Sequence, residues 1–91
     1  MRSEPVRREE DDIRATYRET AAERQLELER GDRHVVLAQN AEGYAMVAVR
    51  VDDTDLESYY GFDMALDHAA EVLGVSPHTI PIPEPARSMG M

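Results

Sequence analysis

The sequence contains no cysteine, no tryptophan and no lysine, and its aromatic residues are four tyrosines and one phenylalanine. Without cysteine there is no disulfide framework, no thiolate zinc site and no thiol nucleophile. No apolar run approaches the roughly 20 residues that a membrane-spanning helix needs. The first dozen residues are mostly charged rather than signal-like. These absences predict a cytoplasmic protein that does not enter a membrane.

The chain has 91 residues and a mass of 10.3 kDa, which predicts one small domain. At this length folding buries about 64 % of the surface of the unfolded chain, so the core is real but thin. We expect a disordered arm over residues 1–8, a single small α+β domain over residues 9–85 and a loose tail over residues 86–91.

Acidic residues outnumber basic ones by 19 to 10, which gives a formal net charge of −9. Most of the excess lies in residues 31–91, which carry ten acidic residues and three arginines. A field of this sign repels phosphate backbones and anionic lipid, so direct binding to nucleic acid or to a membrane is not expected. Two explanations of the acidity and of the missing lysine stay open. One is a GC-rich genome, and the other is a salt-adapted, halophilic cytosol in which carboxylates keep the protein hydrated.

The first third of the chain fits a helix. Acidic residues crowd the segment that begins at Glu9, where they complement a helix dipole. Ile13, Tyr17 and Leu28 then lie on one helical face, and Gly31 is suited to the C-terminal cap. This pattern predicts an N-terminal helix.

The end of the same segment also fits a strand. Residues 24–30 alternate, with Leu26 and Leu28 on one side, and Gly31 with Asp32 suits a two-residue hairpin turn. In that case residues 24–30 are the first strand of a three-stranded meander, which is more stable in water than a lone hairpin. The sequence does not decide between helix and strand here.

Residues 33–40 and 44–51 are rich in β-forming residues, and a short turn with Gly43 separates them, so they predict an antiparallel hairpin. On one face of the second strand every residue is apolar: Ala45, Val47, Val49 and Val51. On its other face, Arg50 is accompanied by Tyr44, Met46 and Ala48, so this face is not fully polar. This face is therefore expected to be partly covered, either by another element or by a second copy of the chain.

A second helix is expected to begin at Asp55 or at Phe62 and to end at Leu73, with Gly74 as its C-terminal cap. Residues 76–85 contain four prolines, so they are expected to lie extended along an edge or over the core. The predicted fold class is therefore α+β. It has an N-terminal helix, a two- or three-stranded antiparallel meander, a C-terminal helix and an extended proline-rich tail.

No pattern indicates a catalytic, metal or cofactor site. His34, His68 and His78 lie on three different predicted elements, without the spacing of metal ligands. The acidic run over residues 52–57 departs from a calcium loop at the positions that require glycine and glutamate. The five glycines are scattered singly, so there is no phosphate-binding loop. We predict no catalytic residue, no metal and no cofactor, and a non-enzymatic function is favoured.

Tyrosines beside acidic residues are the best candidates for a partner-binding surface. Tyr59 and Tyr60 are adjacent, so at most one of them points into a core, and exposed tyrosine is typical of protein interfaces. Acidic residues at helical spacing follow them along the second predicted helix. The predicted partner-binding residues are Asp55, Glu57, Tyr59, Tyr60, Asp63, Asp67 and Glu71.

Three functions remain open on the sequence alone. The favoured one is a small acidic protein-binding or regulatory module that self-associates as a homo-oligomer and binds a protein partner with a basic surface. A second is an acidic inhibitor that imitates nucleic acid and occupies a basic groove, as phage-encoded or antitoxin-like proteins do. The third is a small enzyme subunit with a site between protomers, since a chain this small has little room for a pocket of its own.

Overall fold

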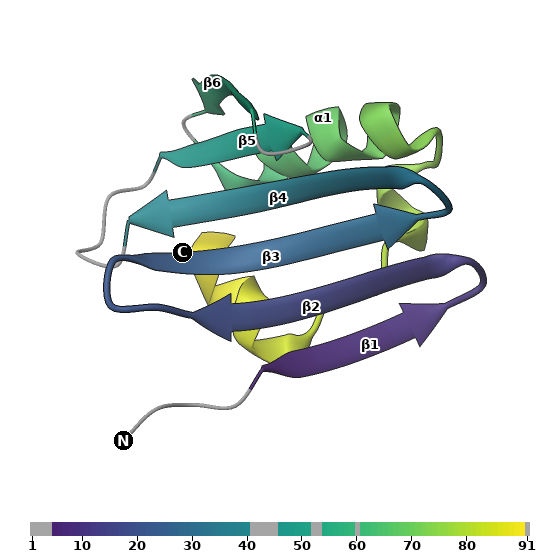
Figure 1. Ribbon diagram of the computed structural model, residues 1–91, viewed down its shortest axis with the longest axis horizontal. Helices are drawn as coiled ribbons and strands as arrows, with labels where there is room; N and C mark the ends of the chain where they lie inside the picture. The colour runs from purple at the N-terminus through teal and green to yellow at the C-terminus, as the bar shows by residue number, and fades with distance from the viewer. Residues whose placement is uncertain (1–4, 41–45, 52–53, 60, 91) are drawn as a thin grey trace.

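The computed structural model describes residues 5–40, 46–51, 54–59 and 61–90. Six strands form one antiparallel sheet in chain order (Figure 1). They are β1 (Val6–Glu10), β2 (Ile13–Glu19), β3 (Glu23–Arg30), β4 (Arg33–Asn40), β5 (Val47–Val51) and β6 (Thr54–Tyr59). After the sheet come the helix α1 (Phe62–Leu73) and two 3-10 helices, η1 (Pro77–Thr79) and η2 (Glu84–Gly90). Figure 1 shows these three helices on one face of the sheet, so the fold has two layers.

The predicted N-terminal helix is wrong, because β1, β2 and β3 occupy that part of the chain. Ile13 and Tyr17 are four residues apart, a spacing that places two residues on one face of a strand as well as of a helix. Of the acidic residues expected in the first helical turn, Glu9 and Glu10 end β1 instead, and Asp11 and Asp12 form the β1–β2 turn, where Asp11 has a φ of 56°. Asparagine and aspartate adopt this left-handed conformation more readily than other non-glycine residues.

The meander is longer than the predicted two or three strands. Residues 24–30 belong to β3, so they form a strand and not a helix. This strand is third in the sheet, whereas the meander alternative had placed it first. The turn after β3 contains Gly31 at a φ of 61°, a value that glycine adopts without steric cost. Val6, expected in a disordered arm, begins β1, and residues 86–90, expected in a loose tail, lie in η2.

The hydrophobic core lies between the covered face of the sheet and the helices. Alternate residues of β2 to β5 supply the sheet side, and α1 supplies most of the other. Tyr17 is buried at the margin of this core, and its hydroxyl donates to Glu19 Oε2 at 2.7 Å. Burial, together with this hydrogen bond, raises the pKa of Tyr17 to about 12. The main buried side chains are Ala15, Tyr17, Leu26, Leu28, Val35, Leu37, Val47, Val49, Leu66, Leu73, Ile80 and Met89.

Two arginines of the β3–β4 hairpin hold the C-terminal end of α1. Arg30 Nη1 donates to the carbonyl oxygen of Leu73 at 2.7 Å, and Arg33 Nη1 donates to that of Val72 at 3.1 Å. The last carbonyls of a helix have no partner within it and carry its negative dipole end, so cations stabilise them. Gly74 follows at a φ of 75°, and a Cβ there would lie 2.9 Å from Arg33 Nη1. The glycine therefore ends the helix and leaves room for the arginine.

A buried hydrogen bond fixes the C-terminal segment to the sheet face that α1 covers. Gln39 of β4 is only 5 % exposed, and its Nε2 donates to the carbonyl oxygen of Met89 at 2.9 Å. Ile80 and Met89 are themselves part of the core. The proline-rich segment thus lies over the sheet, which is one of the two places expected from the sequence.

Replacing Arg30 with alanine removes one bond to α1 and the ion pair of Arg30 Nε with Asp12 Oδ2 at 3.0 Å. We expect the free energy of unfolding to fall by about 1–2 kcal/mol, measured by urea unfolding. Arg7→Ala is the matched control, because Arg7 is exposed on β1, and it should change the free energy by less than about 0.5 kcal/mol. Equal effects of the two substitutions would contradict the role assigned to Arg30.

Candidate functional site

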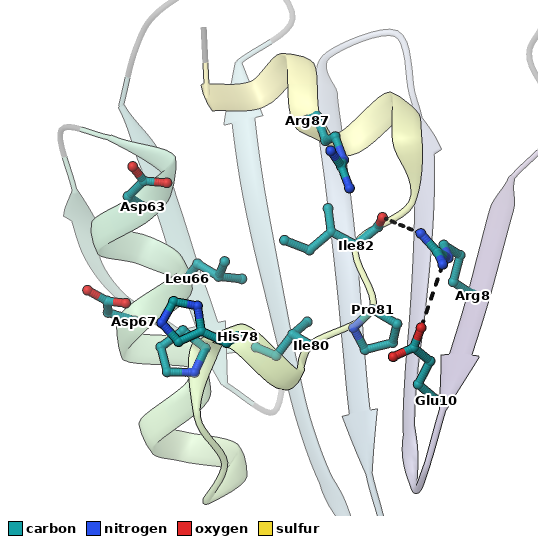
Figure 2. A pocket seen from close by; sticks show the side chains of 11 residues that line it. Arg8, Glu10, Asp63, Leu66, Asp67, His78, Ile80, Pro81, Ile82 and Arg87 are labelled. Atoms are coloured by element: carbon teal, nitrogen blue, oxygen red, sulfur yellow. Dashed lines mark hydrogen bonds and ion pairs between the residues drawn. The ribbon is translucent and has the colours of Figure 1, made fainter.

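A groove of about 630 Å³ opens on the helical side of the molecule, between α1, the segment over residues 77–82 and β1 (Figure 2). Its volume lies in the range of pockets that hold a small ligand. Its lining combines apolar and charged side chains. The lining residues are Arg8, Glu10, Asp63, Leu66, Asp67, Pro77, His78, Ile80, Pro81, Ile82 and Arg87.

The floor of the groove is apolar because the chain between η1 and η2 is held extended. Pro81 and its neighbouring prolines have no amide hydrogen to donate to a sheet. Before this segment, the carbonyl oxygen of Ser76, the residue that caps η1, accepts a hydrogen bond from the Thr79 hydroxyl at 2.7 Å. Ile80 is buried against the core, while Ile82 packs against it in part. Together with Leu66 they present an apolar surface between the charged walls of the groove.

One wall of the groove is acidic. Asp63 and Asp67 are one turn apart on α1, and both are exposed. Within the described part of the chain, neither carboxylate has a hydrogen bond or an ion pair. His78 of η1 also lines the groove. Two unpaired carboxylates on one wall favour a cationic group in the groove.

The opposite wall is basic overall, with two arginines and Glu10. Arg87 reaches into the groove from η2 (Figure 2), and no described residue pairs with its guanidinium. Arg8 of β1 has two long contacts. Its Nη1 lies 3.4 Å from the carbonyl oxygen of Ile82, and its Nη2 lies 3.6 Å from Glu10 Oε2. Both arginines therefore keep donors for an anionic group, since each guanidinium has five N–H donors.

The groove combines charged and apolar surfaces. It offers opposite charges on two walls and an apolar floor between them. Over the described ranges, no group of three or more histidine, aspartate or glutamate side chains is placed to hold a metal ion. A ligand with matching charges at its two ends and an apolar middle fits this arrangement.

The other face of the sheet differs, because its charges pair with one another. Across β1 to β5 the strand register places four arginines and four glutamates on this face, so it has no net charge. Each of these glutamates contacts an arginine of the same face. The arginines are Arg7, Arg14, Arg18 and Arg50, and the glutamates are Glu9, Glu23, Glu27 and Glu29.

The strongest pair on this face joins β3 to β5 across β4. Arg50 Nη1 and Nη2 donate to the two carboxylate oxygens of Glu23 at 3.0 and 2.6 Å. These hydrogen bonds hold the pKa of Glu23 below its usual range. The strand register puts Ala38 between the two partners, and only a small side chain leaves room for the bridge.

No described element covers this second face, which carries a small patch with Val36, Ala38 and Ala48. Ala38 is 4 % exposed, and the other two residues are half-buried. Cover by another element of the chain, one of the two expectations from the sequence, is thus not seen among the described residues. Cover by a second copy stays a prediction.

The structure separates the residues predicted to bind a partner. Asp55, Glu57 and Tyr59 lie on β6 rather than on a helix that begins at Asp55, so that helix start was wrong. Their side chains and the whole of Tyr60 lie outside what the structure describes.

The acidic stripe of the second predicted helix is present on α1, but only part of it belongs to the groove. Asp63 and Asp67 line the groove, whereas Glu71 does not. Glu71 lies 3.9 Å from His68 Nδ1 and is exposed. The sequence reasoning missed Arg8 and Arg87, which come from opposite ends of the chain. Arg87 is the only arginine after Arg50 in the acidic second half of the sequence, and this was the one available signal for it.

The model of a protein family matches residues 7–91 of the chain, and that family is described as a family of unknown function, DUF7111. No curated protein and no solved structure matches the chain. Among the described helices, none is long and apolar enough to cross a membrane.

Replacing Arg50 with glutamine should make the fold less sensitive to acid. A carboxyl whose pKa is lower in the folded than in the unfolded state stabilises the fold above the unfolded pKa, and this contribution is lost as the pH falls. We expect the variant to be about 1 kcal/mol less stable than wild type at pH 7. The difference should shrink below the ordinary glutamate pKa of about 4.3.

Urea unfolding at pH 7 and at pH 3.5 measures this difference. Arg18→Gln is the matched control on the same face, because Arg18 has only a single contact with Glu27, at 3.2 Å. It should cost less at pH 7 than Arg50→Gln. A difference between Arg50→Gln and wild type that is the same at both pH values would contradict the role of Glu23.

Proposed function

This chain belongs to the DUF7111 family of unknown function, and we propose that it is a small non-enzymatic module that binds a protein partner in the groove beside α1. The observation that supports this proposal is the contrast between the two faces. Glutamates on the open sheet face are neutralised by arginines of the same face. Asp63, Asp67 and Arg87, by contrast, have no described partner and line a groove with an apolar floor. Unpaired charges around a concave apolar surface fix the orientation of a ligand.

The chemistry of the groove indicates an extended segment of the partner. Its basic side chain would lie against Asp63 and Asp67, and its apolar side chains would lie on Leu66, Ile80 and Ile82. The net charge of −9 also attracts a basic partner and speeds the encounter at low salt.

The partner is sought by capture from the native host's lysate, after nuclease treatment and at that host's own salt. We expect one stoichiometric protein that is retained by wild type and whose affinity falls at least tenfold with Asp63→Asn plus Asp67→Asn. Two desolvated charged contacts are worth at least about 1.4 kcal/mol together, which is the tenfold change. A partner held equally by wild type and by the double variant would reject the groove as the binding site.

Glu71→Gln is the control that separates this proposal from nucleic-acid mimicry. The mimic is favoured by the position of Asp63, Asp67 and Glu71, which lie at successive turns along one exposed side of α1. A basic groove on a target would contact all three acids, whereas a segment bound in this protein's groove contacts the first two. Unchanged affinity of Glu71→Gln supports the groove, and a loss as large as that of the double variant supports the mimic.

We also propose that a second copy of the chain docks on the open sheet face. Two chains with a net charge of −9 repel each other, and the sheet face over β1 to β5 has no net charge, so it is where copies can approach most easily. Val36, Ala38 and Ala48 give this face a centre of small side chains that permits close stacking.

Size-exclusion chromatography with light scattering tests the second copy. Wild type should have twice the 10.3 kDa chain mass at about 100 μM, within the range of modest protein–protein affinity. Ala48→Arg should be monomeric, because a long charged side chain prevents stacking of the sheets. Glu71→Gln should leave the mass unchanged, because Glu71 lies on α1, on the other side of the sheet from the open face. A monomeric wild type would reject self-association, and with it an enzyme site shared between protomers.

A further inference from the structure

We propose that the groove binds the free C-terminal end of a partner polypeptide, with the terminal carboxylate at Arg8 and Arg87 and a basic side chain at Asp63 and Asp67. The inference rests on the proposed function, because it names the occupant and the direction of binding in the same groove. Four observations support it: the free donors of the arginines, the contact of Arg8 with Ile82 across one end of the groove, the apolar floor and the opposite acidic wall.

The basic wall has the donors that a carboxylate needs. Arginine presents a planar fork of donors that matches the two oxygens of a carboxylate. Arg87 has no described partner, and Arg8 is held only by contacts of 3.4 and 3.6 Å, which are long for charged groups. Figure 2 shows Arg87 reaching from η2 toward Ile82, whose carbonyl oxygen accepts the Arg8 contact. An anion at this point would engage donors from two elements at little cost to existing bonds.

Arg8 reaches across the end of the groove beside β1. The contact of Arg8 with Ile82 joins β1 to the extended segment, and Glu10 adds an ion pair beside it. A polypeptide that ends there supplies its terminal carboxylate to the arginines, which is a known mode of peptide recognition.

The acidic wall fixes the direction of the occupant. Asp63 and Asp67 lie on α1, on the other side of the apolar floor from Arg8 and Arg87 (Figure 2). A lysine or arginine side chain a few residues before the carboxylate would complement them, and apolar side chains between the two charges would cover Leu66 and Ile80. The reverse direction would place carboxylate against carboxylate and is disfavoured by like-charge repulsion.

The test uses the purified full chain and defined peptides. The first peptide is an N-acetylated tetrapeptide of lysine, alanine, valine and leucine with a free C-terminal carboxylate. The second is the same peptide with a C-terminal amide, which removes the terminal charge. The third replaces lysine with norleucine, which removes the cation. Binding is measured by NMR titration against wild type, Arg87→Gln and Asp67→Asn. The control variants are Arg7→Gln, an exposed arginine next to Arg8 whose strand register places it on the other face, and Glu71→Gln on α1.

We expect the amide to bind wild type about fivefold to tenfold more weakly than the free acid. This is the effect of losing one hydrogen-bonded contact between charged groups that are partly exposed to solvent. Arg87→Gln should weaken the free acid by a similar factor and leave the amide unaffected. Asp67→Asn should weaken the lysine peptide and leave the norleucine peptide unaffected. Arg7→Gln and Glu71→Gln should change each dissociation constant by less than about twofold.

Each of the following results would contradict one part of the proposal. Equal binding of acid and amide, or no saturable binding of the acid in the millimolar range, would reject the C-terminal occupant. If capture of a partner still depended on Asp63 and Asp67, the proposed function would stand and the occupant would be an internal segment. Sensitivity to Arg7→Gln equal to that of Arg87→Gln would show general charge attraction instead of a site.

Discussion

The attachment of α1 to the β3–β4 hairpin is the constraint on which the rest of the structure depends. Arg30 and Arg33 donate to the final carbonyls of the helix, and Gly74 leaves the space that Arg33 occupies. Because this end of α1 is fixed on the hairpin, the chain after it returns across the sheet toward β1. The groove is the space between the helix and this returning segment. The shape of the groove thus follows from how one helix end is bound.

Charged residues are arranged differently on the two faces of the sheet. On the open face over β1 to β5, each glutamate contacts an arginine of the same face at a short distance. On the covered face, the charged residues of β1 lie at the edge of the apolar layer, where Arg8 and Glu10 border the groove. Among the described residues, further acidic residues lie away from the open face, in the β1–β2 and β3–β4 turns and on α1. A chain with a net charge of −9 can in this way keep one large surface neutral.

The sequence predicted the parts of the fold that depend on local signals. The stripe from Phe62 to Leu73 followed by Gly74 is helical in the structure, and residues 33–40 form a strand. The N-terminal helix was wrong because Ile13 and Tyr17 satisfy both periodicities, and the choice between them is made by pairing with β3, a contact outside any local window. High helix propensity near Ala21 was outweighed by the hydrogen bonds and burial of a six-stranded sheet.

The same distinction explains how much of the groove could be predicted. Asp63 and Asp67 were found because helical spacing alone puts them on one side of α1. Arg8 and Arg87 belong to segments that were expected to be a disordered arm and a loose tail, so nothing in the sequence placed them opposite those acids. They come together only because β1 adds to the edge of the sheet and Gln39 binds the carbonyl of Met89, which fixes η2 over β3 and β4. Arg8 and Arg87 lie near opposite ends of the sequence, so the topology of the fold brings them to one groove. The ligand of such a site is best inferred from where the topology places these arginines relative to the acidic residues opposite them.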